Sequence, residues 1–153
     1  MHNFTNADLS FTNLRNTDLT YADLSNSNLT GADLRGTNLH GANLYGIDLS
    51  GTDLTGANLS FQNLSSMDVS SIILDNTILY NTNLSGTNLS GKNLSGLNIK
   101  LSNLKFTDFE FSDLSFAHLT NSVMYETNFS HTNLENAHIN DAYITNTDFS
   151  NSN

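Results

Sequence analysis

The sequence predicts an all-β fold in which the chain turns once every five residues and coils into a narrow tube. Three observations predict it. An apolar residue recurs at every fifth position from Phe4 to Phe149 without a break. The residue before it is Asn or Asp with few exceptions, and all nine glycines stand two positions after it. We call the apolar residue the central residue, the position before it the face position, the position two before it the inner flank, and the position two after it the corner.

A period of five fits neither regular secondary structure. Five steps of about 100° along a helix rotate the side chain by about 140° and scatter the apolar row. In a strand, an odd period sends successive central residues to opposite faces. The central residues keep one orientation only if each pentad contains a turn. Gly and Asn at the corners support this, because these residues adopt a positive φ at the least cost.

Length and composition predict one domain covering residues 1–153, because no composition shift or linker divides the chain. The absence of Cys excludes disulfides and thiolate metal sites. Residues 1–10 show no basic start and no apolar run, and no stretch is long and apolar enough to span a membrane. We therefore expect a cytoplasmic protein with no membrane contact. A net charge of −10 disfavours nucleic acid as a direct ligand.

The repeat resembles the pentapeptide-repeat family, whose units have the form Ala-(Asp/Asn)-Leu-X-X, as in Ala32-Asp33-Leu34 and Ala42-Asn43-Leu44. The resemblance covers essentially the whole chain. It implies a right-handed quadrilateral parallel β-helix in which four pentads form a coil of twenty residues. Central and inner-flank side chains then point inward, and the others point outward. At twenty residues per coil, the 153 residues form about 7.6 coils, with no capping helix.

A recurrence of phenylalanine agrees with a coil of that length. Phe109, Phe129 and Phe149 are twenty residues apart, so their rings would stack at the coil spacing of about 4.8 Å.

Departures from the repeat concentrate at the inner flank. Gln62, Met67 and Ile72 follow one another where Ala, Ser or Thr is usual, and the central residue beside Met67 is the smaller Val69. We interpret this as volume compensation within a crowded coil. Lys92 also occupies an inner flank, and a charged amine is costly to bury unpaired. We expect a local distortion that lets Lys92 reach water.

Four consecutive corners form a candidate partner belt, because one apolar side chain falls on each side of a single coil. Bulky residues avoid positive φ, so these corners are predicted to use a different turn type from the glycine corners. The belt is interpreted either as a partner site or as side chains that merely cover the corners. Its members are Leu101, Phe106, Phe111 and Phe116.

No arrangement of residues suggests catalysis, a cofactor or a metal. His118 and His138 could stack on one face, but no third ligand accompanies them, and a metal site needs three or four. No serine has a His and Asp placed to activate it, and the glycines are spaced corners instead of a phosphate-binding loop. We therefore predict that the protein is not an enzyme.

One face carries a candidate acidic stripe, found by sorting the face positions at intervals of twenty. It resembles the surface of topoisomerase-binding, quinolone-resistance members of the family, which look like DNA in shape and charge. A tube of this length spans about 36 Å. Duplex of that length carries roughly twenty phosphate charges, about double the net charge of this chain. The chain lacks the dimerising C-terminal helix and the loops of those members. The stripe consists of Asp8, Asp48, Asp68, Asp108 and Asp148.

Two functions follow as hypotheses. The leading one is a non-catalytic rod that serves as an interaction or scaffold domain for a protein partner. The resemblance to the family further implies a bacterial scaffold or a secreted effector that would act in a host cell. The alternative is an acidic DNA mimic that binds a type II topoisomerase. An uncovered coil exposes unpaired backbone groups, so we expect either that another chain covers the end or that the chain is a segment of a longer protein. End-to-end homodimerisation through the Phe149 end follows as a hypothesis.

Overall fold

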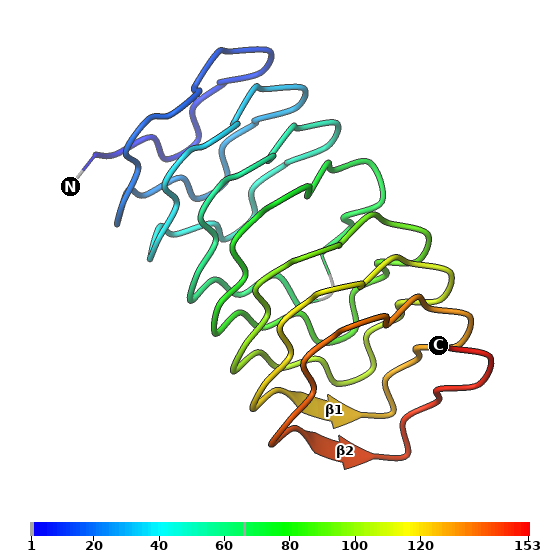
Figure 1. Cartoon of the computed structure of the whole chain (residues 1–153). Coiled ribbons are helices and arrows are strands. Elements are labelled where there is room, and N and C mark those ends of the chain that lie inside the picture. Colours follow the sequence, from blue (N-terminus) through cyan, green and yellow to red (C-terminus); the bar gives the residue numbers. More distant parts are fainter. Residues whose placement is uncertain (1, 66) are drawn as a thin grey trace.

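A computed structural model describes residues 2–65 and 67–153 and shows the chain wound into a four-sided tube (Figure 1). Face positions pair in parallel with the face positions twenty residues later, as in the series Asn13, Asp33 and Asp53. Near the C-terminus the pairing lengthens into strands β1 (Val123–Tyr125) and β2 (Tyr143–Thr145), which are parallel with Val123 opposite Tyr143. The other pairings are single bridges. The predicted all-β architecture and the coil of twenty residues are confirmed.

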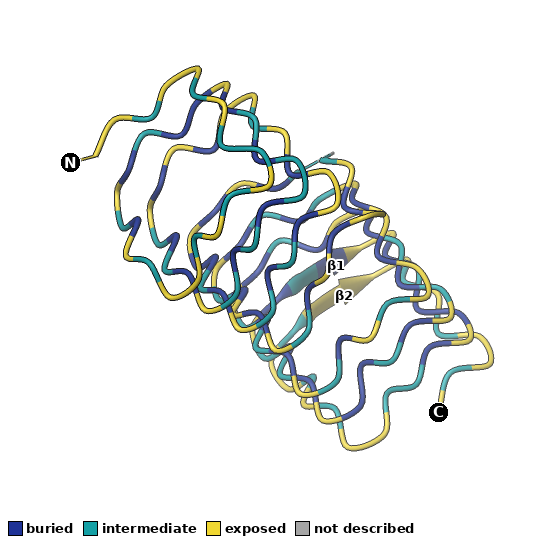
Figure 2. Ribbon diagram, turned by 90° about the horizontal axis from the view of Figure 1, so that it is seen from above, coloured by how far each residue is buried: buried dark blue, intermediate teal, exposed yellow. Residues whose placement is uncertain are grey.

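The central residues fill the tube, as expected (Figure 2). Phe109, Phe129 and Phe149 form the predicted column, with ring centroids 5.0 and 5.2 Å apart and nearly parallel planes. Polar inner flanks are satisfied locally, since the Thr77 hydroxyl donates to the Leu74 carbonyl at 2.7 Å. Within the described residues, no buried side-chain nitrogen or oxygen lacks a hydrogen-bond partner. The interior is therefore closely packed, with small hydroxyl residues beside the apolar column.

The corners correct one prediction. Leu101, Phe106, Phe111 and Phe116 have φ values from 59° to 61°, close to the 64° of Gly31. The predicted change of turn type is therefore wrong. At Phe106 the backbone is held from two directions. Its own amide donates to the next coil at Tyr125 (2.9 Å), and the Thr107 amide closes the turn. These bonds impose the corner conformation on a bulky residue, at a cost of about 1–2 kcal/mol.

The rows of pairing between coils, which we call the ladder, open at two places. On one side of the tube the described residues show no bridge between Asn43 and Asn63 or between Asp48 and Asp68. One coil later, bridges are absent between positions 68 and 88 and between positions 73 and 93. The other sides remain paired at each level, for example through Asp53 with Ile73 and through Asn58 with Ile78.

Bulky inner flanks explain where the ladder opens. Ile47 lies one coil before Met67, and Ile72 lies one coil before Lys92, so each opening separates two large inner side chains. Leu97 is also large, but its neighbours in the same row are Thr77 and Ala117, and there the ladder is intact. The interpretation of volume compensation is thus corrected. The unusual residues do crowd the coils, and the coils respond by separating instead of exchanging volume.

Lys92 occupies the second opening. Its ammonium Nζ donates to the carbonyls of Ser70 at 3.1 Å and Ile72 at 2.9 Å. In a closed ladder a backbone amide would take the second of these carbonyls, so the lysine replaces a missing backbone bond. Burial lowers the pKa of Lys92. The expected local distortion is present, but the charge is satisfied by carbonyl oxygens of the chain itself.

Candidate interaction surfaces

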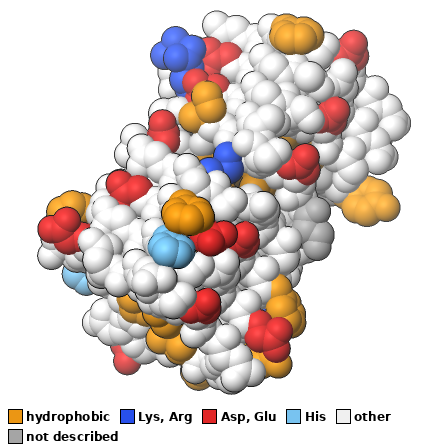
Figure 3. Space-filling view, turned by 90° about the vertical axis from the view of Figure 1, so that its right-hand side faces the viewer, with side chains coloured by type: hydrophobic (Ala, Val, Ile, Leu, Met, Phe, Trp, Pro, Cys, Tyr) orange, Lys and Arg blue, Asp and Glu red, His pale blue; other side chains and the backbone are white. Residues whose placement is uncertain are grey.

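The acidic stripe lies along one face, with Asp and Asn alternating over most of its length. Asn28 donates from its amide to Asp8 at 3.3 Å, and Asn128 donates to Asp108 at 2.9 Å. Each asparagine thereby separates two carboxylates that would otherwise repel one another at adjacent levels. Figure 3 shows one side of the rod, where acidic side chains are spread along its length and basic side chains gather at two places.

Four carboxylates of the stripe, those of Asp8, Asp48, Asp68 and Asp148, have a lowered pKa because the serine two residues further on donates hydrogen bonds to them. Asp68 accepts hydrogen bonds from the Ser70 amide at 3.0 Å and from its hydroxyl at 2.6 Å. The same pair of bonds joins Asp8 to Ser10 at 3.1 and 2.7 Å. The serine hydroxyls, followed by the serine amides, lower the pKa of both carboxyl groups. The stripe is therefore charged at neutral pH, and it is also engaged in the chain's own turns.

The register places Asp directly above Asp at only two points in the sequence, and these two points differ. Between Asp33 and Asp53, the Arg35 guanidinium contacts both carboxylates, at 2.5 and 3.5 Å. The hydrogen bond from Arg35 lowers the pKa of Asp33 to about 2. There the ladder is closed. Between Asp48 and Asp68 the described residues form no ion pair, and there the ladder is open. Unrelieved carboxylate repulsion adds to the crowding at this opening.

The partner belt does not form a single patch. Its side chains are about half exposed, from 45% for Leu101 to 64% for Phe111, but they occupy four different corners of the tube. Two of them pack on residues of the next coil, Phe106 on Tyr125 at 5.5 Å and Phe111 on His131 at 4.8 Å between ring centroids. A flat partner surface could contact at most two of these corners together.

A second set of aromatic side chains, which the sequence analysis missed, does form a continuous surface. Four rings follow one edge of the tube through successive coils, each set edge-to-face on the next, with centroids 5.6, 5.1 and 5.6 Å apart. We call this row the aromatic edge. Tyr21 and Phe61 are more than half exposed. The row consists of Tyr21, His40, Phe61 and Tyr80.

A signal for this edge was present in the sequence. Tyr21 and Phe61 are corners, whereas His40 and Tyr80 stand one position before a corner, so the spacing alternates between 19 and 21. Sorting the sequence at a strict interval of twenty separates these residues into two columns. Only the geometry of the turn brings both columns to the same edge.

The two histidines stack as expected, with ring centroids of His118 and His138 4.8 Å apart. Burial lowers the pKa of His118. Across residues 2–65 and 67–153, no group of three or more metal-ligating side chains is assembled. The same residues contain no helix of the length and apolarity that a membrane crossing requires.

Comparison with known proteins identifies the repeat. A sequence profile of pentapeptide repeats matches the chain in eight copies, with overlapping matches that run from residues 3–36 to residues 112–151. No curated protein sequence gives a significant match.

Solved structures of similar fold include QnrB1, described as a plasmid-mediated fluoroquinolone resistance protein. A trypsin-treated variant of it is 20% identical, with a TM-score of 0.55 over 98% of this chain and 79% of that chain. The full-length protein is 18% identical, with a TM-score of 0.53 over 99% of this chain and 81% of that chain. At these identities the likeness establishes the fold, a right-handed quadrilateral β-helix, and nothing beyond it.

Proposed function

Because the chain belongs to the pentapeptide-repeat family, we propose that it is a non-catalytic rod that binds a protein partner along its outer surface. The tube interior is filled by the central residues, so the outer surface carries the recognition. In this proposal residues 1–153 act as one interaction or scaffold domain, because at least one side of the tube stays paired at every level, including the two openings. A bacterial scaffold or secreted effector is the setting we favour, in the cytoplasm of the producing or host cell.

The aromatic edge is the observation that supports this function. Exposed aromatic side chains are enriched at the centres of protein interfaces, where they bury a large area with little loss of side-chain entropy. Edge-to-face packing already orders the rings from Tyr21 to Tyr80. A partner would therefore bind a preformed surface and would lose less free energy to ordering it.

Photo-crosslinking tests this assignment. A photoreactive amino acid at Tyr80 should give a discrete adduct in a lysate of the source organism, and excess wild-type protein should suppress it. The same probe at Asn136, an exposed corner on another edge, is the control and should give none. Tyr21→Ser should weaken the adduct formed from Tyr80. Equal adducts from both positions would show that the aromatic edge is not the binding surface, and loss only in Phe106→Ser or Phe111→Ser would assign binding to the partner belt.

The acidic stripe supports a second candidate, a DNA mimic that binds a type II topoisomerase. Asp8, Asp48, Asp68, Asp108 and Asp148 would take the place of phosphates, but the interposed asparagines leave five charges over eight levels of the row. A gyrase supercoiling assay distinguishes the candidates. Inhibition that weakens in Asp48→Asn/Asp68→Asn and persists in Tyr21→Ser supports mimicry. Absence of inhibition at micromolar protein removes this candidate.

A further inference from the structure

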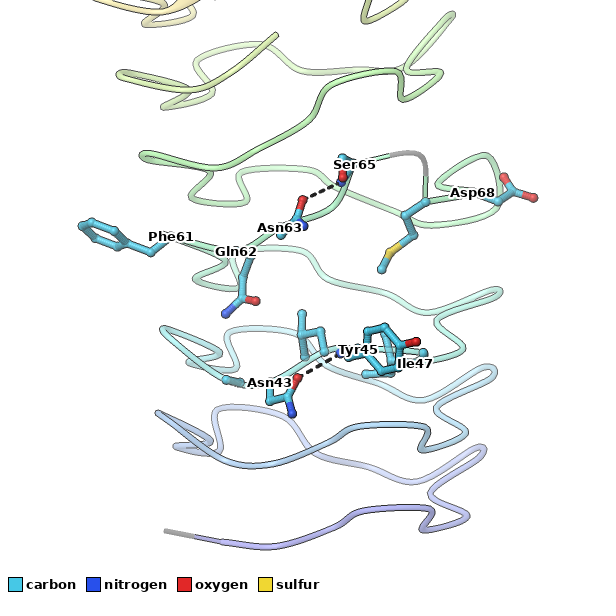
Figure 4. A pocket seen from close by; sticks show the side chains of 12 residues that line it. Asn43, Tyr45, Ile47, Phe61, Gln62, Asn63, Ser65 and Asp68 are labelled. Carbon is cyan, nitrogen blue, oxygen red and sulfur yellow. Dashed lines mark hydrogen bonds between the residues drawn. The ribbon is translucent and has the colours of Figure 1, made fainter. Parts of the chain in front are cut away.

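The first opening of the ladder contains a cavity of about 670 Å³ between two coils. Residues 42–47 line one side, and residues 61–63, 65, 67 and 68 line the other. Figure 4 shows the Gln62 side chain pointing toward the coil that carries Asn43, whereas Phe61 and Asp68 point outward on opposite sides. The Gln62 side-chain amide donates to the Leu39 carbonyl at 2.7 Å, so the slot between the two coils is lined by this polar side chain as well as by Ile47 and Met67, and Asp68 lies at its outer rim.

Both sides of the slot present backbone groups that a closed ladder would pair. One coil earlier, the Leu24 amide donates to the Asn43 carbonyl at 3.0 Å. Within the described residues the equivalent amide, that of Leu44, donates no hydrogen bond, and neither does the amide of Gly46. On the opposite side, the backbone N–H and the backbone C=O of Asn63 likewise form no hydrogen bond with another described backbone group. Unpaired backbone groups at strand spacing are what an added extended chain recognises.

The slot has the volume of a short extended segment. An extended residue occupies about 3.3 Å along the strand, about 4.8 Å between neighbouring strands and about 10 Å through the sheet, or about 160 Å³. The cavity of about 670 Å³ therefore holds about four residues. This is nearly the length of one side of the tube, where the unpaired groups lie.

The carboxylates near the slot indicate which class of ligand it binds. Asp48 and Asp68 form the pair of stacked carboxylates that no described cation contacts, whereas Arg35 contacts both Asp33 and Asp53. The second opening is informative as well, because there the ammonium of Lys92 binds the freed carbonyls. Lys92 also acts electrostatically on Asp68, but the two groups form no ion pair. A cation bound at the first opening would contact Asp48 and Asp68 as Arg35 contacts Asp33 and Asp53. It would also resemble Lys92, whose ammonium binds carbonyls at the second opening.

We propose that the slot binds an extended peptide segment that carries lysine or arginine. The peptide backbone pairs with the backbone N–H groups of Leu44 and Gly46 on one side and with the backbone N–H and C=O of Asn63 on the other, none of which forms a hydrogen bond with another described backbone group. Its alternate side chains point inward toward Ile47 and Met67 and outward toward Asp48 and Asp68. The proposal does not depend on the aromatic edge, because its hydrogen-bonding groups and its carboxylates all lie outside that row.

A fluorescein-labelled peptide of sequence Lys-Val-Lys-Val-Lys-Val, capped at both ends, provides the test. Its fluorescence anisotropy should rise saturably with the protein and fall as salt is added. Hydrogen exchange at the Leu44 and Gly46 amides, fast in the free protein, should slow at least about tenfold when the peptide binds. A Glu-Val peptide of the same length is the control for charge and should not bind.

Two variants test the location. Ile47→Ala/Met67→Thr should let the ladder close, so that the Leu44 amide becomes protected without peptide and peptide affinity falls at least about tenfold. Leu97→Thr, which changes a large inner flank at a closed position, should leave the affinity unchanged. Asp68→Asn should weaken binding about two- to fivefold, while Asp148→Asn at the far end of the stripe should not.

Three results would overturn the proposal. One is equal binding by the protein with the closed ladder, and another is equal binding of the Glu-Val peptide. The third is full competition by lysine methyl ester at equal concentration, which would show a site for small cations instead. Tyr21→Ser/Tyr80→Ser should keep peptide affinity at the wild-type value, so failure of the aromatic edge and failure of the slot are separate outcomes.

Discussion

At the scale of single residues, the corners show how strongly the coil dictates backbone conformation. Among residues 2–65 and 67–153, nineteen residues other than glycine have positive φ, and nine of these are asparagine. The sequence predicted positive φ at Gly and Asn corners because those residues adopt it most easily. It could not predict the same conformation for Phe106 or Leu101, because local preference opposes it. The hydrogen bonds that override this preference come from residues nineteen positions away, such as Tyr125 for Phe106 and Thr120 for Leu101.

Two glycines distinguish the cost of a positive φ from the cost of a steric clash with neighbouring atoms. Gly56 and Gly41 both have positive φ, but a Cβ on Gly56 would meet nothing within 4 Å, whereas one on Gly41 would come within 2.5 Å of the Tyr21 ring. Gly56→Ala should therefore lower the free energy of unfolding by about 1 kcal/mol. Gly41→Ala should lower it by about 2 kcal/mol, because the ring must also leave its place. Urea titration measures both, and equal losses would show that the Tyr21 ring does not rest on Gly41.

The aspartates at the face positions predict how stability depends on pH. The pKa of Asp33 is lowered to about 2, and those of Asp8, Asp23 and Asp68 are also lowered. A lowered pKa in the folded state gives stability that is present above the ordinary value of 3.8 and is lost as pH falls through the folded value. The free energy of unfolding should thus fall a little as pH drops below 6.5, because burial also lowers the pKa of His118, and should fall further between about 4 and 2 as the aspartates are protonated.

Thermal unfolding monitored by circular dichroism at a series of pH values tests this expectation. Asp33→Asn removes the largest of these shifts, so the fall in acid should be shallower in that variant. Asn133→Asp offers a matched control that adds a carboxylate directly above Asp113. It should lower stability at pH 7 and regain part of it at pH 4. A stability curve for wild type that is flat down to pH 2 would contradict the role assigned to these aspartates.

At the scale of the coil, the row of inner flanks decides whether adjacent levels can meet. The sequence pointed to Gln62, Met67, Ile72 and Lys92 as misfits, but it suggested compensation within one coil. The relevant neighbours are twenty residues apart, and reading Ile47 against Met67 or Ile72 against Lys92 requires the coil length. Even then, packing in three dimensions decides whether two large side chains interlock or push the coils apart. For this reason the sequence identified the unusual residues but predicted neither the positions of the openings nor their form.

Shortening both members of one crowded pair should close the ladder. In Ile72→Thr/Lys92→Thr the Leu74 amide should gain the missing bond to the Asn93 carbonyl, and the desolvation of a charged amine is avoided. We expect the midpoint of thermal unfolding to rise by several degrees and exchange of the Leu74 amide to slow.

Leu97→Thr is the matched control for that experiment. Leu97 is large but sits where the ladder is closed, so its replacement should leave a void and lower the free energy of unfolding by about 2–3 kcal/mol. If both variants lost stability alike, the large residues at positions 72 and 92 would be well packed, and crowding would not explain the opening.

At the scale of the whole molecule, the openings divide the rod into an N-terminal and a C-terminal block. These blocks are joined by fewer hydrogen bonds than other adjacent coils are. A solenoid is stabilised by contacts between adjacent coils, so a weak junction limits how far unfolding spreads. The tubular form and its register could be read from the sequence because the period of five never slips between Phe4 and Phe149. The weak junction could not be predicted in this way, because it depends on which side chains meet twenty residues apart and not on the repeat period.

A buried charge on either side of the junction should reveal the two blocks. Leu29→Asp places a carboxylate in the core of the N-terminal block and should expose amides such as Leu34 to exchange, while the Leu84 and Leu104 amides stay protected. Leu104→Asp should show the converse pattern. Hydrogen exchange followed by mass spectrometry resolves the two halves. Simultaneous loss of protection along the entire chain in Leu29→Asp would indicate a single cooperative unit.

The parallel bridges between residues twenty positions apart also constrain how a chain of this kind can change its length over evolutionary time. Duplication or deletion of a complete coil returns every later residue to its former side, so the acidic stripe and the aromatic edge are simply lengthened or shortened. Gain of a single pentad preserves the hydrophobic interior equally well, but it rotates everything beyond it by one side of the tube. Genetic events that are equivalent for folding are therefore unequal for recognition, and lineages that retain a partner should differ in length by whole coils.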